Sequence, residues 1–340
     1  MERNKSVKRW TLLSLFAGAG GLDLGFRGGF TFLGKSYPRT PFDIVKAYDI
    51  NPHAVATYNA NLEPVCEVKD VTALDPDDLP KADVVLGGFP CQDFSLAGKR
   101  QGINVHRGNL YKALVLAVEA VRPKVFLAEN VKGLLTANEG LAIRVIANDF
   151  AQAGPGYRIH MALLNAAHFG VPQRRERVFI VGVRKDLEGE FLFPQPTHAP
   201  PLLADGVNLL PWVTAQDALH DLEDDRNLKL LPNWEWSKAR KNRGQGNRPI
   251  RADEPAPTIR TEHHGNVEFH YALPRRLSVR EAARLQSFPD TFVFHASMSE
   301  AYRLVGNAVP PVLAWHLAAA VGEFLGREAS LEDVPEALSL

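Results

Sequence analysis

Residues 10–26 read WTLLSLFAGAGGLDLGF, an apolar strand that runs into a glycine-rich turn and then into a helix. Such a turn lets a ligand approach the backbone and meet the helix N-terminus, although a simple tight connection produces the same local pattern. Asp23 stands where a dinucleotide-binding turn has its third glycine, and a carboxylate there would lie near a pyrophosphate. We therefore expect an adenosyl ligand without phosphates.

Similar apolar runs continue along the first half of the chain and alternate with helix-like stretches. This alternation is typical of an α/β, doubly wound parallel sheet covered on both faces. The expected strands are residues 10–16, 43–49, 65–69, 82–86, 125–128, 158–164 and 177–183. Asp49 and Asp70 close the second and third strands, where carboxylates can accept ribose hydroxyls and an adenine amino group. Either could instead be a helix cap, but open α/β sheets bind ligands at this edge.

The alternation of apolar strands and helix-like stretches ends after Arg184. Residues 193–201, FPQPTHAPP, are too rich in proline to continue the sheet and are interpreted as a linker. From there to about residue 275 the periodicity is poor and turn residues are dense. The helical pattern returns at residues 278–285, where Ser278 and Glu281 form a capping box.

Composition narrows the class of protein. The composition, 45% hydrophobic and 23% charged, is enough to bury a substantial core, and 340 residues are long enough for two domains. We expect a cytoplasmic protein without a signal peptide or membrane span, and two dissimilar cysteines predict neither disulfides nor a zinc site. The net charge is zero, so nucleic-acid binding would need a local basic patch. Residues 237–251 supply one, with six basic residues and no acidic residue.

Two strand ends carry groups suited to covalent chemistry. The turn Gly87-Gly88-Phe89-Pro90-Cys91 follows an apolar run and presents its thiol to solvent, whereas Cys66 fits the commoner buried role. Glu129 ends another strand at the same edge, and a thiol beside a carboxyl acid suggests covalent catalysis on an electron-poor ring. The cluster at 173–177, QRRER, would alternate faces, although alone it would pass for a solvated strand end.

These motifs together resemble those of bacterial-type DNA cytosine-5 methyltransferases, and they follow the order of that family. They cover residues 10–325, and only the part between about 186 and 275 lacks a strong motif. The matching motifs are Phe16-Ala17-Gly18-Ala19-Gly20-Gly21, Pro90-Cys91-Gln92, Glu129-Asn130-Val131, Gln173-Arg174-Arg175-Glu176-Arg177, the run REAARLQ at 280–286, and Gly306-Asn307-Ala308-Val309-Pro310.

The resemblance implies a Rossmann-like, S-adenosylmethionine-dependent fold with two domains. Residues 1–186 and 302–328 would form the catalytic domain, and residues 187–301 a smaller, irregular target-recognition domain. The cofactor would be S-adenosylmethionine, leaving as S-adenosylhomocysteine, without a metal. Its binding residues would be Phe16, Gly18, Gly20, Gly21, Leu22, Asp49, Ile50, Asp70, Val71, Asn307 and Ala308.

The resemblance also implies a role for each catalytic residue. Cys91 would add as thiolate to C6 of a cytosine, which makes C5 nucleophilic enough to take a methyl group. Glu129 would contact N3 and the exocyclic amine, with a pKa raised by its dry pocket. Arg175 would hold the base carbonyl and Arg177 would order the site. The pocket would be framed by Pro90 and Asn130.

The target cytosine has to leave the helix for this chemistry. Residues 92–108, polar and glycine-containing, look like the loop that closes over DNA in this family. In the recognition segment, Gln245 resembles the residue that fills the hole left by the base, and Arg248 resembles a base-reading arginine. Thr258 matches the threonine that steadies the neighbouring backbone. The full predicted DNA-binding set is Gln92, Ser95, Arg243, Gln245, Arg248, Thr258 and Arg260.

Other classes fit less well. An RNA-directed relative would carry a Cys-Phe-Thr signature in the recognition segment, which contains no cysteine. A catalytically silent DNA-binding relative would have lost the Pro-Cys pair, the Glu-Asn-Val acid or the cofactor glycines, and all three are present. Asp23 disfavours a nicotinamide dehydrogenase. The expected partners are double-stranded DNA and a separately encoded restriction endonuclease, for a monomer without membrane contact.

Overall fold

The computed structural model describes residues 8–89, 110–239, 248–261 and 267–332. Six residues singled out from the sequence lie outside these ranges: Pro90, Cys91, Gln92, Ser95, Arg243 and Gln245. Their roles stay predictions.

A seven-stranded sheet forms the centre of the molecule, in the order β5-β4-β1-β6-β7-β9-β8. Each of the predicted strands is present within a few residues of its expected bounds. The strands are β1 (Trp10–Leu15), β4 (Phe42–Asp49), β5 (Cys66–Val68), β6 (Val84–Gly88), β7 (Val125–Val131), β8 (Tyr157–Asn165) and β9 (Glu176–Arg184). A small antiparallel hairpin, β2 (Phe30–Phe32) with β3 (Lys35–Tyr37), lies outside this sheet.

The prediction of an all-parallel sheet is wrong at one edge. Five strands, β5 to β7 in sheet order, run parallel, but β9 pairs antiparallel with both β7 and β8. The reason is the connection from β8 to β9, residues 166–175, which contains only the short 3-10 helix η6 (Ala166–Phe169). A parallel pair needs a longer crossover, so a short connection returns the chain in the opposite direction. The fold is thus a mixed, Rossmann-like α/β sheet.

Helices cover both faces of the sheet and create two separate buried cores. One face carries α1 (Gly21–Arg27), α2 (Pro52–Asn61) and the long α10 (Pro311–Glu332); the other carries α3 (Leu110–Val121) and α4 (Leu141–Gln152). At Gly25 a Cβ atom would lie 2.3 Å from the Cβ of Ala314, so glycine permits the close packing of α1 on α10. The stretch Met298–Ser330 is apolar enough to cross a membrane, yet 72% of its most apolar window is buried inside the protein. It serves here as a core element.

The remaining elements follow the proline-rich segment, which leaves the sheet as expected. It is more than a linker, however, because its end starts a small unit that projects from the side of the molecule: β10 (His198–Ala199), α5 (Pro201–Val207) and β11 (Leu210–Pro211). The short helices α6 (Ala215–Leu219) and α7 (Asp225–Lys229) come next. The predicted capping box is confirmed, since Ser278 and Glu281 cap α8 (Val279–Leu285) reciprocally. Helix α9 (Met298–Asn307) packs against α8.

Candidate active site

A cavity of about 620 Å³ lies at the carboxyl edge of the sheet. A cavity of about 880 Å³ elsewhere is lined by the β2–β3 hairpin, α6 and residues 284–292, but the residues singled out from the sequence gather at the smaller one. Gly20, the N-cap residue of α1, belongs to the turn beside the cavity but does not itself line it. The other predicted cofactor residues line the cavity: Phe16, Gly18, Gly21, Leu22, Asp49, Ile50, Asp70, Val71, Asn307 and Ala308.

The glycine turn is shaped by its neighbours. Gly18 and Gly20 have φ values of +56° and +86°, a backbone conformation that residues with a side chain rarely adopt. A Cβ atom at Gly20 would also come within 2.4 Å of Leu62 and 2.9 Å of Tyr58. The Gly18 amide donates a hydrogen bond of 2.8 Å to Asp49 Oδ2. The carboxylate of β4 therefore holds the turn that follows β1.

Asp23 lines the cavity, and its side chain also has a structural role that its place in the sequence did not suggest. Its side chain is fully buried and accepts hydrogen bonds from Ser14 Oγ (3.0 Å) and Tyr58 Oη (2.9 Å). Burial raises the pKa of Asp23 to about 6. Through these two hydrogen bonds, Asp23 links α1 to β1 and α2. Asp49 adds a second carboxylate that disfavours a pyrophosphate in this cavity, because it already accepts the Gly18 amide.

The hydrogen-bond acceptors and an apolar side chain in this cavity fit an adenosyl group. Asp49 Oδ1 and Oδ2 each accept one backbone amide, from Asn51 and Gly18, which leaves further lone pairs for ribose hydroxyls. Asp70 caps the 3-10 helix η1 (Val71–Ala73) at the end of β5. Ile50 is 65% exposed beside the cavity, so an apolar side chain is available to a flat purine ring.

The end of β6, which directly precedes the segment with Cys91 in the sequence, lies beside the end of β7. Gly88 of β6 lies opposite Glu129 of β7. A Cβ atom at Gly88 would lie 3.3 Å from Glu129 Oε2, so a larger residue would crowd the acid. Asn130 Nδ2 donates a hydrogen bond of 2.8 Å to the carbonyl of Phe89. Asn130 thus fixes the backbone directly before Pro90 and Cys91.

Glu129 lies at the inner wall of the same cavity. Its side chain is 11% exposed, and Oε1 forms an ion pair of 2.9 Å with Nε of Arg177. Burial raises the pKa of Glu129, while the positive charges of Arg177 and Arg175 oppose the rise. A carboxyl group in this setting keeps its proton to higher pH than an exposed glutamate.

Two of the three arginines of the QRRER cluster, Arg175 and Arg177, line the cavity, but their surroundings differ. Arg175 is 1% exposed, and it donates from Nη1 to the Ile259 carbonyl (3.1 Å) and from Nη2 to the Gly306 carbonyl (2.8 Å). Burial lowers the pKa of Arg175 to about 9. Its terminal nitrogens join the end of α9 to the recognition segment. Arg177, paired with Glu129, is the arginine with a side chain partly open at the cavity.

A groove of about 470 Å³ continues from the cavity, since Val131 and Arg177 line both. Thr258 Oγ1 donates to the Arg174 carbonyl at 2.8 Å on its wall. Several lining residues were not predicted as site residues from the sequence, among them Lys132, Arg174 and Asn165 of the groove and Thr261 of the cavity. Arg174 stands in a quoted motif and Lys132 directly follows one.

The described basic residues of the recognition segment differ in their surroundings. Arg248 and Arg260 are exposed. Lys238 is exposed and lies 4.4 Å from the centre of the Trp236 ring. Arg251 forms an ion pair of 3.0 Å with Asp253, so its charge is offset within the protein.

Comparison with known proteins gives one consistent result. A family model for C-5 cytosine-specific DNA methylase matches residues 10–323. The Type II methyltransferase M.NgoFVII of Neisseria gonorrhoeae is 39% identical over 335 residues, covering 91% of this chain and 85% of the relative. M.FnuDI of Fusobacterium nucleatum is 36% identical, covering 92% and 94%. The crystal structure of a candidate DNA modification methyltransferase from an E. coli prophage shares the fold, with a TM-score of 0.69 and 24% identity over 93% of this chain and 99% of that one.

Proposed function

This chain belongs to the C-5 cytosine-specific DNA methylases, and on that premise we propose that it methylates C5 of cytosine within a specific sequence of double-stranded DNA. The observation that carries the proposal is one cavity shared by two sets of groups. Asp49 and Asp70 line one part of it, and Glu129 with Arg177 line another part together with Phe89, which directly precedes Pro90 and Cys91 in the sequence. A methyl donor and a flipped base could therefore meet there.

Each residue has a task in this reaction. Cys91 forms a bond to C6 of the cytosine, while Glu129 donates a proton or hydrogen bond to N3, so that C5 becomes nucleophilic. S-adenosylmethionine, when bound, supplies an electrophilic methyl group. Arg177 orients Glu129 and binds the base carbonyl, in place of Arg175. Loss of the C5 proton and breaking of the C6–sulfur bond then free the thiol of Cys91.

The cytosine reaches this cavity by flipping out of the duplex, because C5 and C6 are not both open to attack in a stacked helix. The groove beside Thr258 suits the backbone next to the flipped nucleotide. We assign target reading to Arg248, Arg260 and Arg243, filling of the hole left by the base to Gln245, and loop closure to Gln92 and Ser95. Residues 187–301 would form the recognition domain, and residues 1–186 with 302–328 the catalytic domain.

The names of the relatives suggest the biological role. M.NgoFVII and M.FnuDI are named Type II methyltransferases, so we propose that this chain protects host DNA beside a separately encoded restriction endonuclease. It would act as a monomer in the cytoplasm, where the DNA is.

Transfer of a labelled methyl group tests the function. The purified chain should label duplex DNA, and mapping the 5-methylcytosines on a long duplex should reveal one short sequence. Label in transfer RNA instead would support an RNA-directed enzyme, and label in neither would support a silent DNA-binding relative.

We expect Arg177→Lys and Arg175→Lys to fail in different ways. Arg177→Lys should slow single-turnover transfer by about 10–100-fold at a nearly unchanged melting temperature, because it weakens the contacts to Glu129 and the base. Arg175→Lys should instead lower the free energy of unfolding by about 1–3 kcal/mol, because a lysine cannot serve both carbonyls. If Arg175→Lys keeps its melting temperature but loses the transfer rate, Arg175 contacts the base after all.

We also expect the substitution of a base-reading residue and that of a phosphate-binding residue to have different effects. Arg248→Ala should relax discrimination at one base pair, by about 1–3 kcal/mol if the arginine binds the base in a bidentate way. Lys238→Ala should weaken binding to all duplexes and reduce its salt dependence, with a much smaller effect on transfer at saturating DNA. Transfer rates on a panel of single-base variants, together with binding at several salt concentrations, measure both. Full discrimination in Arg248→Ala would move the reading residues to the segment beginning at Arg260.

A further inference from the structure

Residues 49–51 carry two of the groups that would bind the cofactor. They join the end of β4 to the start of α2, and all three line the cavity. The Asp49 carboxylate accepts the backbone amides of Gly18 and Asn51, and the side chain of Ile50 is 65% exposed. The places of the Asp49 and Ile50 side chains therefore depend on what holds Asn51.

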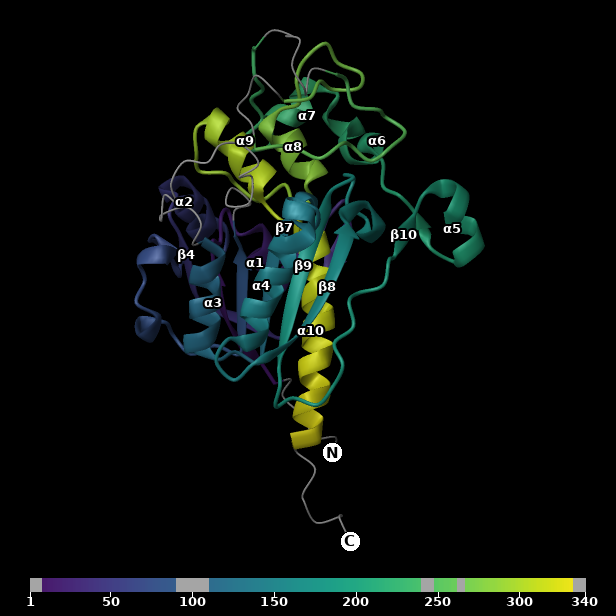
Figure 1. Cartoon of the computed structure of the whole chain (residues 1–340). Coiled ribbons are helices and arrows are strands. Elements are labelled where there is room, and N and C mark those ends of the chain that lie inside the picture. Colours follow the sequence, from purple (N-terminus) through teal and green to yellow (C-terminus); the bar gives the residue numbers. More distant parts are fainter. Residues whose placement is uncertain (1–7, 90–109, 240–247, 262–266, 333–340) are drawn as a thin grey trace, which may run out of the picture.

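The side-chain amide of Asn51 has two defined partners. Its Oδ1 accepts the backbone amide of His53 at 2.9 Å and so caps α2. Its Nδ2 donates a hydrogen bond of 2.7 Å to Oε1 of Glu300 in α9, the helix that lies next to α2 (Figure 1). Both partners require the same orientation of the amide, because a backbone N–H needs an acceptor and a carboxylate needs a donor.

Glu300 reaches Asn51 from outside the cavity. Its side chain is 19% exposed, and it is not among the described residues that line the cavity. Its second oxygen, Oε2, accepts a hydrogen bond of 3.3 Å from Arg303 on the surface of α9. The same helix ends at Asn307, which does line the cavity. Glu300 thus ties residues 49–51 to the helix that carries another part of the predicted cofactor site.

Other contacts hold the rest of α2 independently of Glu300. Thr57 Oγ1 accepts the amide of His295 at 3.0 Å. The side chain of Asn61 exchanges two hydrogen bonds of 2.8 Å with the backbone of Val293. These contacts remain when Glu300 is replaced, so we expect α2 to stay in place and only its first turn and the segment before it to loosen.

We propose that Glu300 is a positioning residue for the cofactor: it holds Asn51, and thereby places the Asp49 carboxylate and the Ile50 side chain, without touching the cofactor. Hydrogen bonds to charged groups are stronger than those between neutral groups, and this one is only partly open to water. Groups that bind a ligand have to be held close to their productive geometry before it arrives. Without the bond, residues 49–51 would have to become ordered on binding, which costs affinity. This inference rests on the proposed function.

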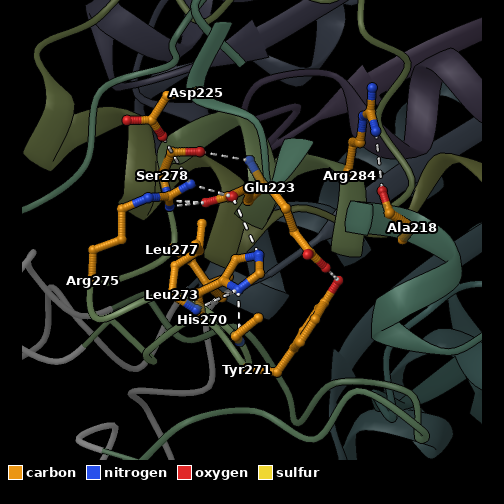
Figure 2. Close-up of polar contacts among 12 residues, drawn as sticks. Ala218, Glu223, Asp225, His270, Tyr271, Leu273, Arg275, Leu277, Ser278 and Arg284 are labelled. Carbon is orange, nitrogen blue, oxygen red and sulfur yellow. Dashed lines mark hydrogen bonds and ion pairs between the residues drawn. The ribbon is translucent and has the colours of Figure 1, made fainter. Parts of the chain in front are cut away.

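The test compares two substitutions of Glu300. Glu300→Ala removes the acceptor, whereas Glu300→Gln keeps a carbonyl acceptor but loses the charge. Arg303→Ala removes the ion pair on α9 and leaves the bond to Asn51. Glu223→Ala is the matched control, because Glu223 also accepts a hydrogen bond from a side chain of another segment, Tyr271, but in the predicted recognition domain (Figure 2).

Three measurements separate positioning from general damage. Titration calorimetry without DNA gives the Kd for S-adenosylhomocysteine. Hydrogen exchange in the free protein follows the amides of Asn51 and His53, which donate to the side chains of Asp49 and Asn51. Kinetics at saturating duplex give kcat and the KM for S-adenosylmethionine. Loss of a group that only positions the binding segment raises KM, whereas loss of folded enzyme lowers kcat.

We expect Kd and KM to rise about tenfold in Glu300→Ala, with faster exchange of both amides and a nearly unchanged kcat. Glu300→Gln, Arg303→Ala and Glu223→Ala should stay within about threefold of the parent, because the first keeps an acceptor for Asn51 and the other two leave that bond alone.

A rescue makes the test independent of how well Glu300→Ala folds. Asn51→Asp keeps an acceptor for the His53 amide but sets two carboxylates against each other, so it should weaken binding. Adding Glu300→Gln restores a donor and an acceptor with exchanged roles, so the Kd should return toward that of the parent.

The proposal is wrong if Glu300→Ala binds S-adenosylhomocysteine like the parent, or if Glu300→Gln or Arg303→Ala loses as much affinity as Glu300→Ala. It is also wrong if the double variant binds no better than Asn51→Asp alone. A parent that neither binds S-adenosylhomocysteine nor transfers a methyl group would instead overturn the proposed function.

Discussion

Replacing Cys91 by serine should abolish methyl transfer, by a factor on the order of 10⁴ or more, as removal of other enzymatic nucleophiles does. A serine hydroxyl is far less ionised than a thiol near neutral pH, so the bond to C6 would not form. The glycines before Cys91 are unchanged, and the groups that would bind the cofactor, such as Asp49 and Asp70, line the cavity independently of the thiol.

Single-turnover transfer and cofactor affinity, both measured on Cys91→Ser, check this expectation. Cofactor affinity should stay close to that of the parent. Cys66→Ala is the matched control: Cys66 is buried at the start of β5, and burial raises the pKa of its thiol, so its loss should leave the chemistry intact. Nearly normal turnover in Cys91→Ser would refute the covalent mechanism.

Glu129→Gln should slow transfer by about 10²–10⁴-fold, the usual range for a general acid or base. The glutamine has nearly the same volume, but it has no acidic proton for N3 and no charge for Arg177. The fold should survive, because Glu129 belongs to β7, whose pairing with β6 and β9 is made by the backbone.

The pH dependence gives an independent check on Glu129. Burial raises the pKa of Glu129, and an acid loses its proton as the pH rises through its pKa. If the protonated carboxyl is required, the single-turnover rate of the parent should fall as the pH rises above that raised pKa. Glu129→Gln should lack this fall. An identical profile in both proteins would mean that another group supplies the proton.

The strands and the cavity edge could be predicted because their signals are local. An apolar run followed by glycine or aspartate marks the end of a strand, and parallel strands bring such ends to one edge. The direction of β9 was missed because it depends on the short path from β8, and the apolar pattern of a strand is the same in either direction. The role of Asp23 was missed because its partners, Ser14 and Tyr58, are set by packing.

The same limit applies to the arginines. Alternation along residues 173–177 correctly separates the buried Arg175 from the exposed Arg174. It does not predict that Arg175 donates hydrogen bonds to two backbone carbonyls. Those contacts depend on Ile259 and Gly306, more than 80 residues away in the chain. The described segments between residues 248 and 278 show no periodic pattern, because isolated bridges hold them together.

The covalent bond between Cys91 and the target base is the central claim, and trapping it is the most direct test. A duplex with 5-fluorocytosine at the mapped position has no C5 proton to lose, so the complex should stop after methyl transfer. With S-adenosylmethionine present, intact-mass measurement should show the protein joined to one DNA strand plus one methyl group, and peptide mapping should place the link at Cys91. An enzyme that methylates the unmodified duplex but forms no such adduct, or forms it at another residue, would contradict the account.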